Sequence, residues 1–119
     1  MVLYGPFSRL ILKLLMGKTE KIRQLLGELE NALRMQALWQ ATSPTKSELA
    51  SRMPFAVDTL RPEQWLQWIF IPRMVALIDN QQAIPNLEMH PYFSHVWQQP
   101  SHVALLTLIS RIDEACQSC

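Results

Sequence analysis

Apolar residues recur at helical spacing near both ends of the chain. In the first stretch they fall at i, i+3, i+4, i+7 and i+11: Ile22, Leu25, Leu26, Leu29 and Leu33. Because charged and amide residues occupy the positions between them, the pattern predicts an amphipathic helix with a candidate cap at Thr19 and an end near Trp39. The second stretch has similar spacing: Leu105, Leu106, Ile109, Ile112 and Cys116. It predicts a last helix that Ser101 caps, after Pro100 has ended the preceding helix.

In the middle of the chain, apolar residues surround the predicted helix axis instead of forming one stripe. This helix begins at Pro62, which suits a first helical position, and it extends to about Asp79. A helix that is apolar on most sides is the buried centre of its domain. Pro72 lies within it, removes one backbone hydrogen bond and pushes on the preceding turn. We therefore expect a kink or break between Trp68 and Pro72.

The other segments predict turns and short helices. Residues 41–61 form a connector that starts with turn residues, and residues 46–52 have the pattern of a short helical turn. Pro91 opens a short helix after a loop at residues 83–90. The sequence has no alternating strand pattern and no Asn-Gly or Asp-Gly hairpin signal. These features predict an all-α protein, a small irregular bundle of about four helices whose central helix is kinked at Pro72.

Length and composition favour a single domain. The chain has 119 residues, of which 49% are apolar, so a core can form without disulfides or a metal. Met16 begins a stretch that resembles an ordinary protein start, so we expect residues 1–15 to be an N-terminal extension and residues 16–119 to be one helical domain. The alternative is that residues 1–15 form a genuine leading helix. No apolar run reaches the ~20 residues of a membrane span, and no signal-peptide cleavage site follows the first apolar stretch. We therefore expect a cytoplasmic protein.

Two features of the composition bear on partners. Only 18% of the residues are charged, against a typical ~25%, which leaves neutral or apolar surface for a protein partner or for self-association. The net charge of +1 is uneven: residues 1–52 hold eight Lys/Arg and four Asp/Glu, a balance of +4, whereas residues 53–119 hold three and six, a balance of −3. The basic half could face an acidic partner or nucleic acid, although ordinary solvated helix faces give the same counts.

Catalytic, cofactor and metal sites are not expected. Cys116 and Cys119 form a C-x-x-C pair at a helix C-terminus, where the helix dipole opposes thiolate formation, and two thiols supply only half the ligands of a structural zinc site. His90, His95 and His102 lack the i, i+4 spacing of a helical metal site. Neither a G-x-S-x-G motif nor a phosphate-binding glycine loop occurs in the sequence. The sequence therefore predicts no enzyme activity, no cofactor and no metal.

Two adjacent stretches carry a family resemblance. Pro-Phe-Ala-Val-Asp-Thr-Leu at residues 54–60 is followed by Glu-Gln-Trp-Leu-Gln-Trp-Ile-Phe-Ile-Pro-Arg-Met at residues 63–74. In this order and spacing they resemble the signature of the YqcC-like family of small bacterial proteins of unknown function, and the likeness extends from about Met16 to the C-terminus. The resemblance implies a helical bundle in the bacterial cytoplasm, often encoded beside tRNA pseudouridine synthase C. It supplies no catalytic residue, because the family has none established.

The signature and its surroundings contain six candidate partner-binding residues: Asp58, Thr59, Trp65, Trp68, Arg73 and Tyr92. In the functional interpretation, Asp58, Thr59 and Arg73 are a polar set that faces a partner. In the structural interpretation, Asp58 and Arg73 form a buried ion pair, or Asp58 and Thr59 bond to backbone groups where the central helix begins. We favour the structural interpretation. Trp65 and Trp68 are three residues apart and face roughly the same way. They could form a platform for bases, but their apolar neighbours favour core packing.

Three functions follow, in order of preference. The first is a protein-binding accessory or regulatory factor linked to tRNA pseudouridine modification, with an unidentified protein partner. The second is a nucleic-acid-binding helical module that binds tRNA or another nucleic acid through the basic half. Its basic residues are Lys13, Lys18, Lys21, Arg23, Arg34, Lys46 and Arg52. The third is a binder of a small apolar ligand in a groove near Trp65 and Tyr92. The partner, the process and the oligomeric state stay open at this point.

Overall fold

Helices make up the framework of the part of the chain that the structure describes. The computed structural model describes the backbone of residues 6–117 and the side chains of residues 17–117. The helices are α1 (Pro6–Met35), α2 (Lys46–Leu49), α3 (Pro62–Trp65), α4 (Ile71–Asp79), α5 (His90–Val96) and α6 (Val103–Gln117). No strand occurs among these residues, which confirms the predicted all-α class. None of the described helices combines the length and the apolar character that a bilayer crossing requires.

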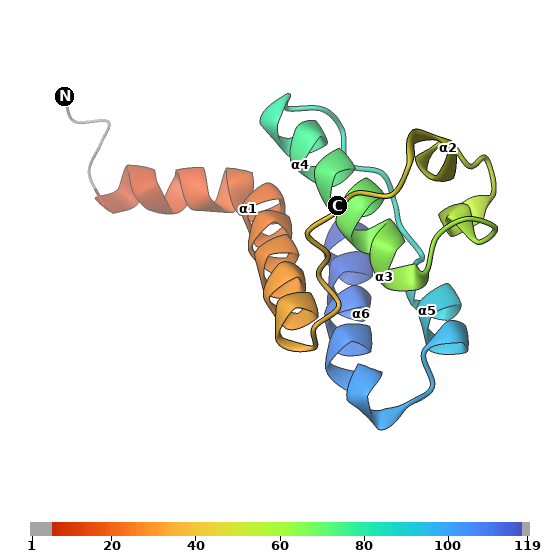
Figure 1. Cartoon of the computed structure of the whole chain (residues 1–119). Coiled ribbons are helices and arrows are strands. Elements are labelled where there is room, and N and C mark those ends of the chain that lie inside the picture. The colour runs from red at the N-terminus through yellow and green to blue at the C-terminus, as the bar shows by residue number, and fades with distance from the viewer. Residues whose placement is uncertain (1–5, 118–119) are drawn as a thin grey trace.

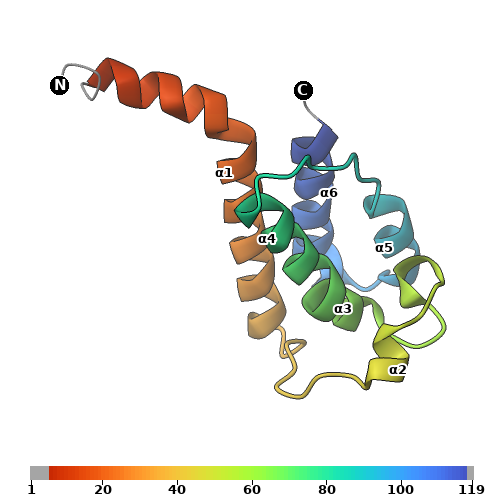
Figure 2. The ribbon, with the colours of Figure 1, turned by 90° about the horizontal axis from the view of Figure 1, so that it is seen from above.

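The second half of α1 and the whole of α6 lie side by side and run in opposite directions (Figures 1 and 2). Helices α3 and α4 follow one another, α4 packs against α1, and α5 packs against α6. Helix α2 belongs to the connector and lies away from α1 in both views. The first turns of α1 extend beyond the other helices, so the bundle forms around its second half (Figure 1).

The hydrophobic core lies where α1, α4, α5 and α6 meet. All five apolar residues that predicted the first helix are buried, because the stripe that they form faces the bundle. Helix α6 contributes Leu105, Ile109, Ile112 and Cys116, whereas Leu106 is half-buried. The core therefore follows the helical period at both ends of the chain.

Helix α1 begins earlier than its sequence pattern predicts. It starts at Pro6 and passes through Thr19 without interruption, so Thr19 does not cap it. Met16 lies inside this helix. The assignment of residues 1–15 to an extension stays a prediction, and residues 1–5 lie outside the described part of the chain.

Helix α1 also ends earlier than predicted, at Met35, because the next residues form a C-terminal cap. Ala37 adopts a left-handed conformation with φ 58°. The N–H of Leu38 donates to the carbonyl of Leu33 at 2.9 Å, and the N–H of Ala37 donates to the carbonyl of Arg34 at 3.1 Å. These two bonds form a Schellman motif, which satisfies the last carbonyls of the helix and turns the chain.

We expect Ala37→Gly to raise the free energy of unfolding by about 0.5–1 kcal/mol, because glycine adopts a left-handed backbone without the steric cost of a Cβ atom. Urea denaturation followed by circular dichroism measures the change. The matched control is Ala76→Gly, at an exposed position within α4, where the same substitution should lower the free energy of unfolding by about 1 kcal/mol. Equal destabilisation by both substitutions would mean that Ala37 is not strained.

The central helix distorts before Pro72 through one widened turn. Between α3 and α4, residues Leu66–Phe70 (η3) form a π-helical turn, in which the N–H of Ile71 donates to the carbonyl of Leu66. Both junctions keep right-handed helical φ and ψ, so the helix continues across the turn. Because Pro72 has no N–H and its ring crowds the preceding turn, the wider turn accommodates both features. The predicted kink is therefore a π turn.

A buried carboxylate joins α6 to the start of α5. Asp113 is only 6% exposed, and its oxygens accept hydrogen bonds from the N–H of Met89, at 2.9 and 3.0 Å, and from the N–H of His90, at 2.8 Å. The first N–H groups of a helix have no partner inside it, so this carboxylate replaces a capping side chain. Burial raises the pKa of Asp113, and the N–H groups of His90 and Met89 act in the opposite direction.

Ser101 is not the cap of α6, in contrast to the prediction. It lies within a 3₁₀ turn, Pro100–His102 (η4), which continues directly into α6. Pro100 therefore opens the last helical segment, and α5 has already ended at Val96. The ring of His102 stacks on Trp97 with centroids 5.0 Å apart, which holds the turn against the bundle.

Candidate functional site

Two signature residues bond within the connector. Asp58 is exposed and accepts a hydrogen bond from the hydroxyl of Ser51. The hydroxyl of Thr59 donates to the carbonyl of Glu48 at 2.7 Å. Since Glu48 lies in α2, this bond satisfies a carbonyl near the end of that short helix and not a group at the start of the central helix. Both side chains therefore fix the shape of the connector.

Arg73 lies on an exposed strip of α4, beside Pro72 and on the same side as Ala76. No ion pair among the described residues involves Arg73. The buried pair of Asp58 with Arg73 that the sequence suggested does not form, because Asp58 is exposed and bonds to Ser51 instead. Arg73 thus presents its positive charge to solvent.

Trp65 lies in an aromatic cluster. Phe55 stacks on Tyr92 with ring centroids 4.2 Å apart, and it meets the edge of Trp65 at 4.8 Å. Phe55 reaches this place from a tight turn, Pro54–Ala56 (η2), where its own φ is 57° and the left-handed backbone is strained. Burial raises the pKa of Tyr92. Phe55 therefore fills the position near Trp65 and Tyr92 that the third hypothesis assigns to a small apolar ligand.

Trp68 is in a different environment from Trp65 and lines a groove between the end of α1 and η3. We call this hollow of about 570 Å³ the Trp39 groove, and its lining residues are Arg34, Trp39, Gln40, Ala41, Gln67, Trp68 and Pro72. Trp65 instead packs against Phe55 and stacks on Phe70 with centroids 5.5 Å apart. The two signature tryptophans therefore form no shared platform, and the aromatic neighbour of Trp68 in the groove is Trp39.

A buried amide fixes one side of the Trp39 groove. Gln67 is 5% exposed; its Oε1 accepts from the N–H of Gln40 at 2.8 Å, and its Nε2 donates to the carbonyl of Gln40 at 2.7 Å. One side chain thus satisfies both backbone polar groups of Gln40. The Oε1 of Gln40 in turn accepts from Nε1 of Trp68 and from Nε2 of Gln64, both at 3.3 Å. This network ties the segment after α1 to the central helix.

Arg34 supplies the positive charge of the Trp39 groove. Its guanidinium lies over the ring of Trp39, 4.7 Å from the centroid, in a cation–π arrangement. Its Nε also pairs with Glu30, one turn earlier on α1, at 2.9 Å. None of the residues that line the groove carries a carboxylate. The groove therefore combines two indole rings, amide groups and one cation.

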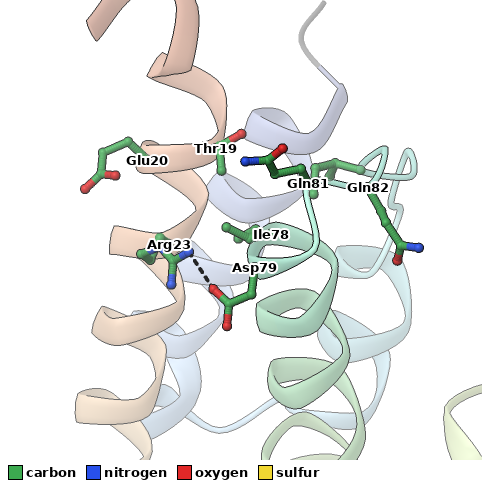
Figure 3. Close-up of a pocket in the computed structure, with 8 residues that line it drawn as sticks. Thr19, Glu20, Arg23, Ile78, Asp79, Gln81 and Gln82 are labelled. Carbon is green, nitrogen blue, oxygen red and sulfur yellow. Dashed lines mark hydrogen bonds and ion pairs between the residues drawn. The ribbon is translucent and has the colours of Figure 1, made fainter. Parts of the chain in front are cut away.

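A second hollow lies between α1 and the end of α4 (Figure 3). Its volume is about 480 Å³, and it is lined by Thr19, Glu20, Arg23, Ile78, Asp79, Gln81, Gln82 and Ile84. Arg23 and Asp79 pair across it with an N–O distance of 2.9 Å, as Figure 3 shows. Glu20, Asp79 and the C-terminal end of α4 outweigh the charge of Arg23. Because Arg23 is already paired with Asp79, we interpret this hollow as the place where α1 and α4 are joined by an ion pair and not as a ligand site.

The described titratable groups do not gather into a metal-binding set. Cys116 is fully buried, and burial raises the pKa of its thiol to about 11, which keeps it protonated at neutral pH. Its neighbour in the C-x-x-C pair, Cys119, lies outside the described residues. Within the described part of the chain, no group of three or more His, Cys, Asp and Glu could hold a metal ion.

The sequence patterns gave no site role to Trp39, Gln40 and Gln67, which supply most of the ring and amide groups of the groove. Gln67 carried a signal, because it is an amide inside the apolar run from Trp65 to Ile71. A polar residue in such a run is either exposed or bonded to another buried polar group. Trp39 carried no comparable signal, since its role depends on where the chain goes after α1 ends.

Comparisons with known proteins place the chain in a family. Residues 21–115 match the family model DUF446, described as tRNA pseudouridine synthase C. A Pectobacterium carotovorum protein named tRNA pseudouridine synthase C is 44% identical over 71 residues, which are 60% of this chain and 19% of that protein. An uncharacterised protein of Haemophilus influenzae is 35% identical, and the uncharacterised protein YqcC of Escherichia coli is 33% identical. These two matches cover 77% and 79% of this chain and 89% of each relative.

The fold agrees with these matches. The solution NMR structure of YqcC from Escherichia coli has a TM-score of 0.77 to this structure and is 30% identical, covering 86% of this chain and 91% of that chain. The chain thus spans most of the length of two small relatives and about a fifth of the Pectobacterium protein. The signature at residues 54–74, the helical bundle and the family match lead to the same conclusion. The chain belongs to the YqcC-like family, whose model carries the description tRNA pseudouridine synthase C.

Proposed function

We propose that this protein is a non-catalytic accessory factor that binds a tRNA pseudouridine synthase. The observation that carries the proposal is the Pectobacterium protein, in which the matched segment makes up 19% of a chain named tRNA pseudouridine synthase C. About four fifths of that protein lies outside the match, which is room for a separate catalytic domain. A segment similar to this chain therefore occurs within a longer chain that carries the name of the synthase.

The same unit also occurs as a small separate protein. The relatives from Haemophilus influenzae and Escherichia coli are matched over 89% of their lengths, so they contain little besides this unit. Joining two folded units by a linker raises their effective concentration for one another to about the millimolar range. Such a linkage favours units that bind each other or act on one substrate. When the unit is a separate chain, it must reach the enzyme through an affinity of its own.

The chemistry of the described residues supports an accessory role. The Asp113 carboxylate is occupied by backbone N–H groups, and Asp58 accepts a hydrogen bond from Ser51. The Cys116 thiol is buried, and its pKa is raised. These groups stabilise the fold, so the proposal leaves the reaction to the partner enzyme. Association with a tRNA-modifying enzyme would place the protein in the cytoplasm.

We expect the full-length protein and tRNA pseudouridine synthase C from the same bacterium to form a complex in the absence of tRNA. We expect a dissociation constant in the micromolar range, because the two proteins fold separately and the interface of such a non-obligate complex is partly polar. Isothermal titration calorimetry measures the affinity, and size-exclusion chromatography gives the composition of the complex. The rate of pseudouridine formation, measured with and without the protein, shows whether binding changes catalysis.

The control enzyme is a different pseudouridine synthase of the same bacterium, which should not bind. Absence of a complex both with and without tRNA would contradict the proposal, even if the two genes are neighbours. A complex that forms only with tRNA and disappears after nuclease treatment would replace it with a nucleic-acid-binding function.

A further inference from the structure

We propose that the Trp39 groove binds a single unpaired nucleotide, which stacks its base in the groove and places its phosphate near Arg34. The inference does not rest on the proposed function, because it concerns the protein alone. The volume of the Trp39 groove, about 570 Å³, lies in the range of ~300–1,000 Å³ that is usual for ligand sites. The groove combines two flat indole rings with a cation, and no carboxylate lines it.

The flat surfaces of the groove come from two indole rings and one guanidinium. Trp39 and Trp68 are both half-buried, so each ring keeps an exposed part. The guanidinium of Arg34 lies over Trp39 and extends that aromatic surface by a second plane. Unpaired bases stack on aromatic rings and on arginine planes, and every base has such a face. Stacking of an unpaired base therefore gives the two tryptophans of this polar hollow a role in binding.

The polar groups of the groove suit the remaining parts of a nucleotide. The Nε atom of Arg34 is used by Glu30, but no described residue bonds to its two Nη atoms, which form a fork that matches a phosphate. The Oε1 of Gln40 already accepts from Trp68 and Gln64. These two donors fix which end of the amide faces them, so Nε2 of Gln40 remains as a donor for a base edge.

Charge distinguishes the Trp39 groove from the hollow of Figure 3. That hollow contains Glu20 and Asp79, and its arginine is already paired, so it repels a phosphate. Arg34 pairs with Glu30 through Nε alone, and the exposed Arg73 follows Pro72, which lines the groove. Two arginines against one glutamate leave a net positive charge here, whereas Glu20 and Asp79 outnumber Arg23 in the other hollow, so an anion is favoured at this end of the bundle.

The groove is held in shape before a ligand arrives. Gln67 fixes both backbone groups of Gln40, and the π turn places Trp68 and Pro72 on the same hollow. Sites that are ordered in advance lose less conformational entropy on binding. A base that is paired in a duplex is stacked on both sides and cannot enter such a groove, so the ligand must be single-stranded.

The test uses fluorescence anisotropy of the full-length protein with labelled oligonucleotides of about twelve nucleotides. The probes are oligouridine RNA, oligothymidine DNA and a blunt-ended RNA duplex, in which every base is paired. We expect the two single strands to bind and the duplex to bind at least about tenfold more weakly. Equal binding of RNA and DNA would mean that the groove recognises the base and the phosphate. Tighter binding of RNA would mean that it also recognises the 2′-hydroxyl group.

The decisive variant is Arg34→Gln, and its matched control is Arg111→Gln. Both arginines lie on helices, both contact a glutamate, and their side chains are 54% and 50% exposed, so neither substitution should unfold the protein. We expect Arg34→Gln to weaken single-strand binding about five- to tenfold and to reduce its salt dependence, and Arg111→Gln to leave both unchanged. Trp39→Leu should weaken binding more than Trp39→Phe, which retains a ring.

Three results would overturn the inference. The first is no binding of either single strand at millimolar protein concentration. The second is equal weakening by Arg34→Gln and Arg111→Gln, which would mean attraction by net charge alone. The third is unchanged indole N–H resonances of Trp39 and Trp68 on addition of the oligonucleotide, since a base stacked in the groove must shift them. The buried indole of Trp97 serves as the internal reference.

Discussion

Replacing Asp113 by alanine is expected to lower the free energy of unfolding by about 3 kcal/mol. The carboxylate is the partner of the N–H groups of Met89 and His90 at the start of α5, and Asp113 and Met89 are both buried. Alanine leaves these two donors without a partner, and each buried donor without a partner costs about 1–3 kcal/mol. The substitution also detaches the loop before α5 from α6. Urea denaturation measures the loss, and an unchanged midpoint would contradict the assigned role.

Asp113→Asn is the matched control, and it also tests the electrostatics. Its amide oxygen can still accept from the N–H groups, so the loss should be about 1 kcal/mol. Burial raises the pKa of Asp113, so the folded state keeps the proton to a higher pH than the unfolded state. The stability that Asp113 contributes therefore falls as the pH rises from its ordinary pKa to the raised value, and it is constant above that range.

Asparagine does not titrate, so the two proteins together isolate this effect. The free energy of unfolding of the unsubstituted protein, minus that of Asp113→Asn, should decrease as the pH rises above the ordinary pKa of an aspartate. Denaturation curves at several pH values measure the difference. An increase over the same range would mean that the N–H groups of His90 and Met89 outweigh burial.

The helices could be predicted because burial imposes a period on the sequence. The stripe from Ile22 to Leu33 and the stripe from Leu105 to Cys116 both face the core. The ends of the helices follow a different rule, since they depend on local backbone bonds. A glycine in place of Ala37 would have predicted the end of α1, but an alanine in the left-handed conformation has no such sequence signal.

The buried polar residues were predictable in kind but not in their partners. Asp113 lies four residues after Ile109 and three before Cys116, which puts it on the buried stripe of α6, and Gln67 lies within an apolar run after Leu66. Such a residue must bond to another buried group. The partner lies 27 residues away for Gln67 and 24 residues away for Asp113, and only the packing of the helices decides it.

The candidate site shows the same limit on sequence reasoning. The signature brought Trp65 and Trp68 to attention because they lie close together in the sequence, yet the structure separates them. Trp68 and Trp39 line the same groove because the cap at Ala37 turns the chain toward the central helix. Asp58 and Arg73 suggested an ion pair because their charges are opposite, but the connector directs Asp58 to Ser51. Neither outcome follows from spacing or charge alone.

Gln67→Leu is expected to have the second large effect, a loss of about 2–3 kcal/mol in the free energy of unfolding. Leucine occupies a similar volume, so the loss does not come from a cavity. It comes from the N–H and the carbonyl of Gln40, which lose the amide that satisfies both. The matched control is Gln24→Leu at an exposed position of α1, where the change should stay within about 0.5 kcal/mol.

Hydrogen exchange at the amide of Gln40 distinguishes this cause from a general loss of stability. If Gln67 holds the segment after α1, its replacement should accelerate exchange at Gln40 far more than at the buried core of α6, since local opening no longer breaks two hydrogen bonds. Equal acceleration throughout the bundle would mean that Gln67 contributes only to global stability. The same loosening would separate Trp39 from Trp68, so Gln67→Leu should also weaken oligonucleotide binding, although Gln67 need not touch the ligand.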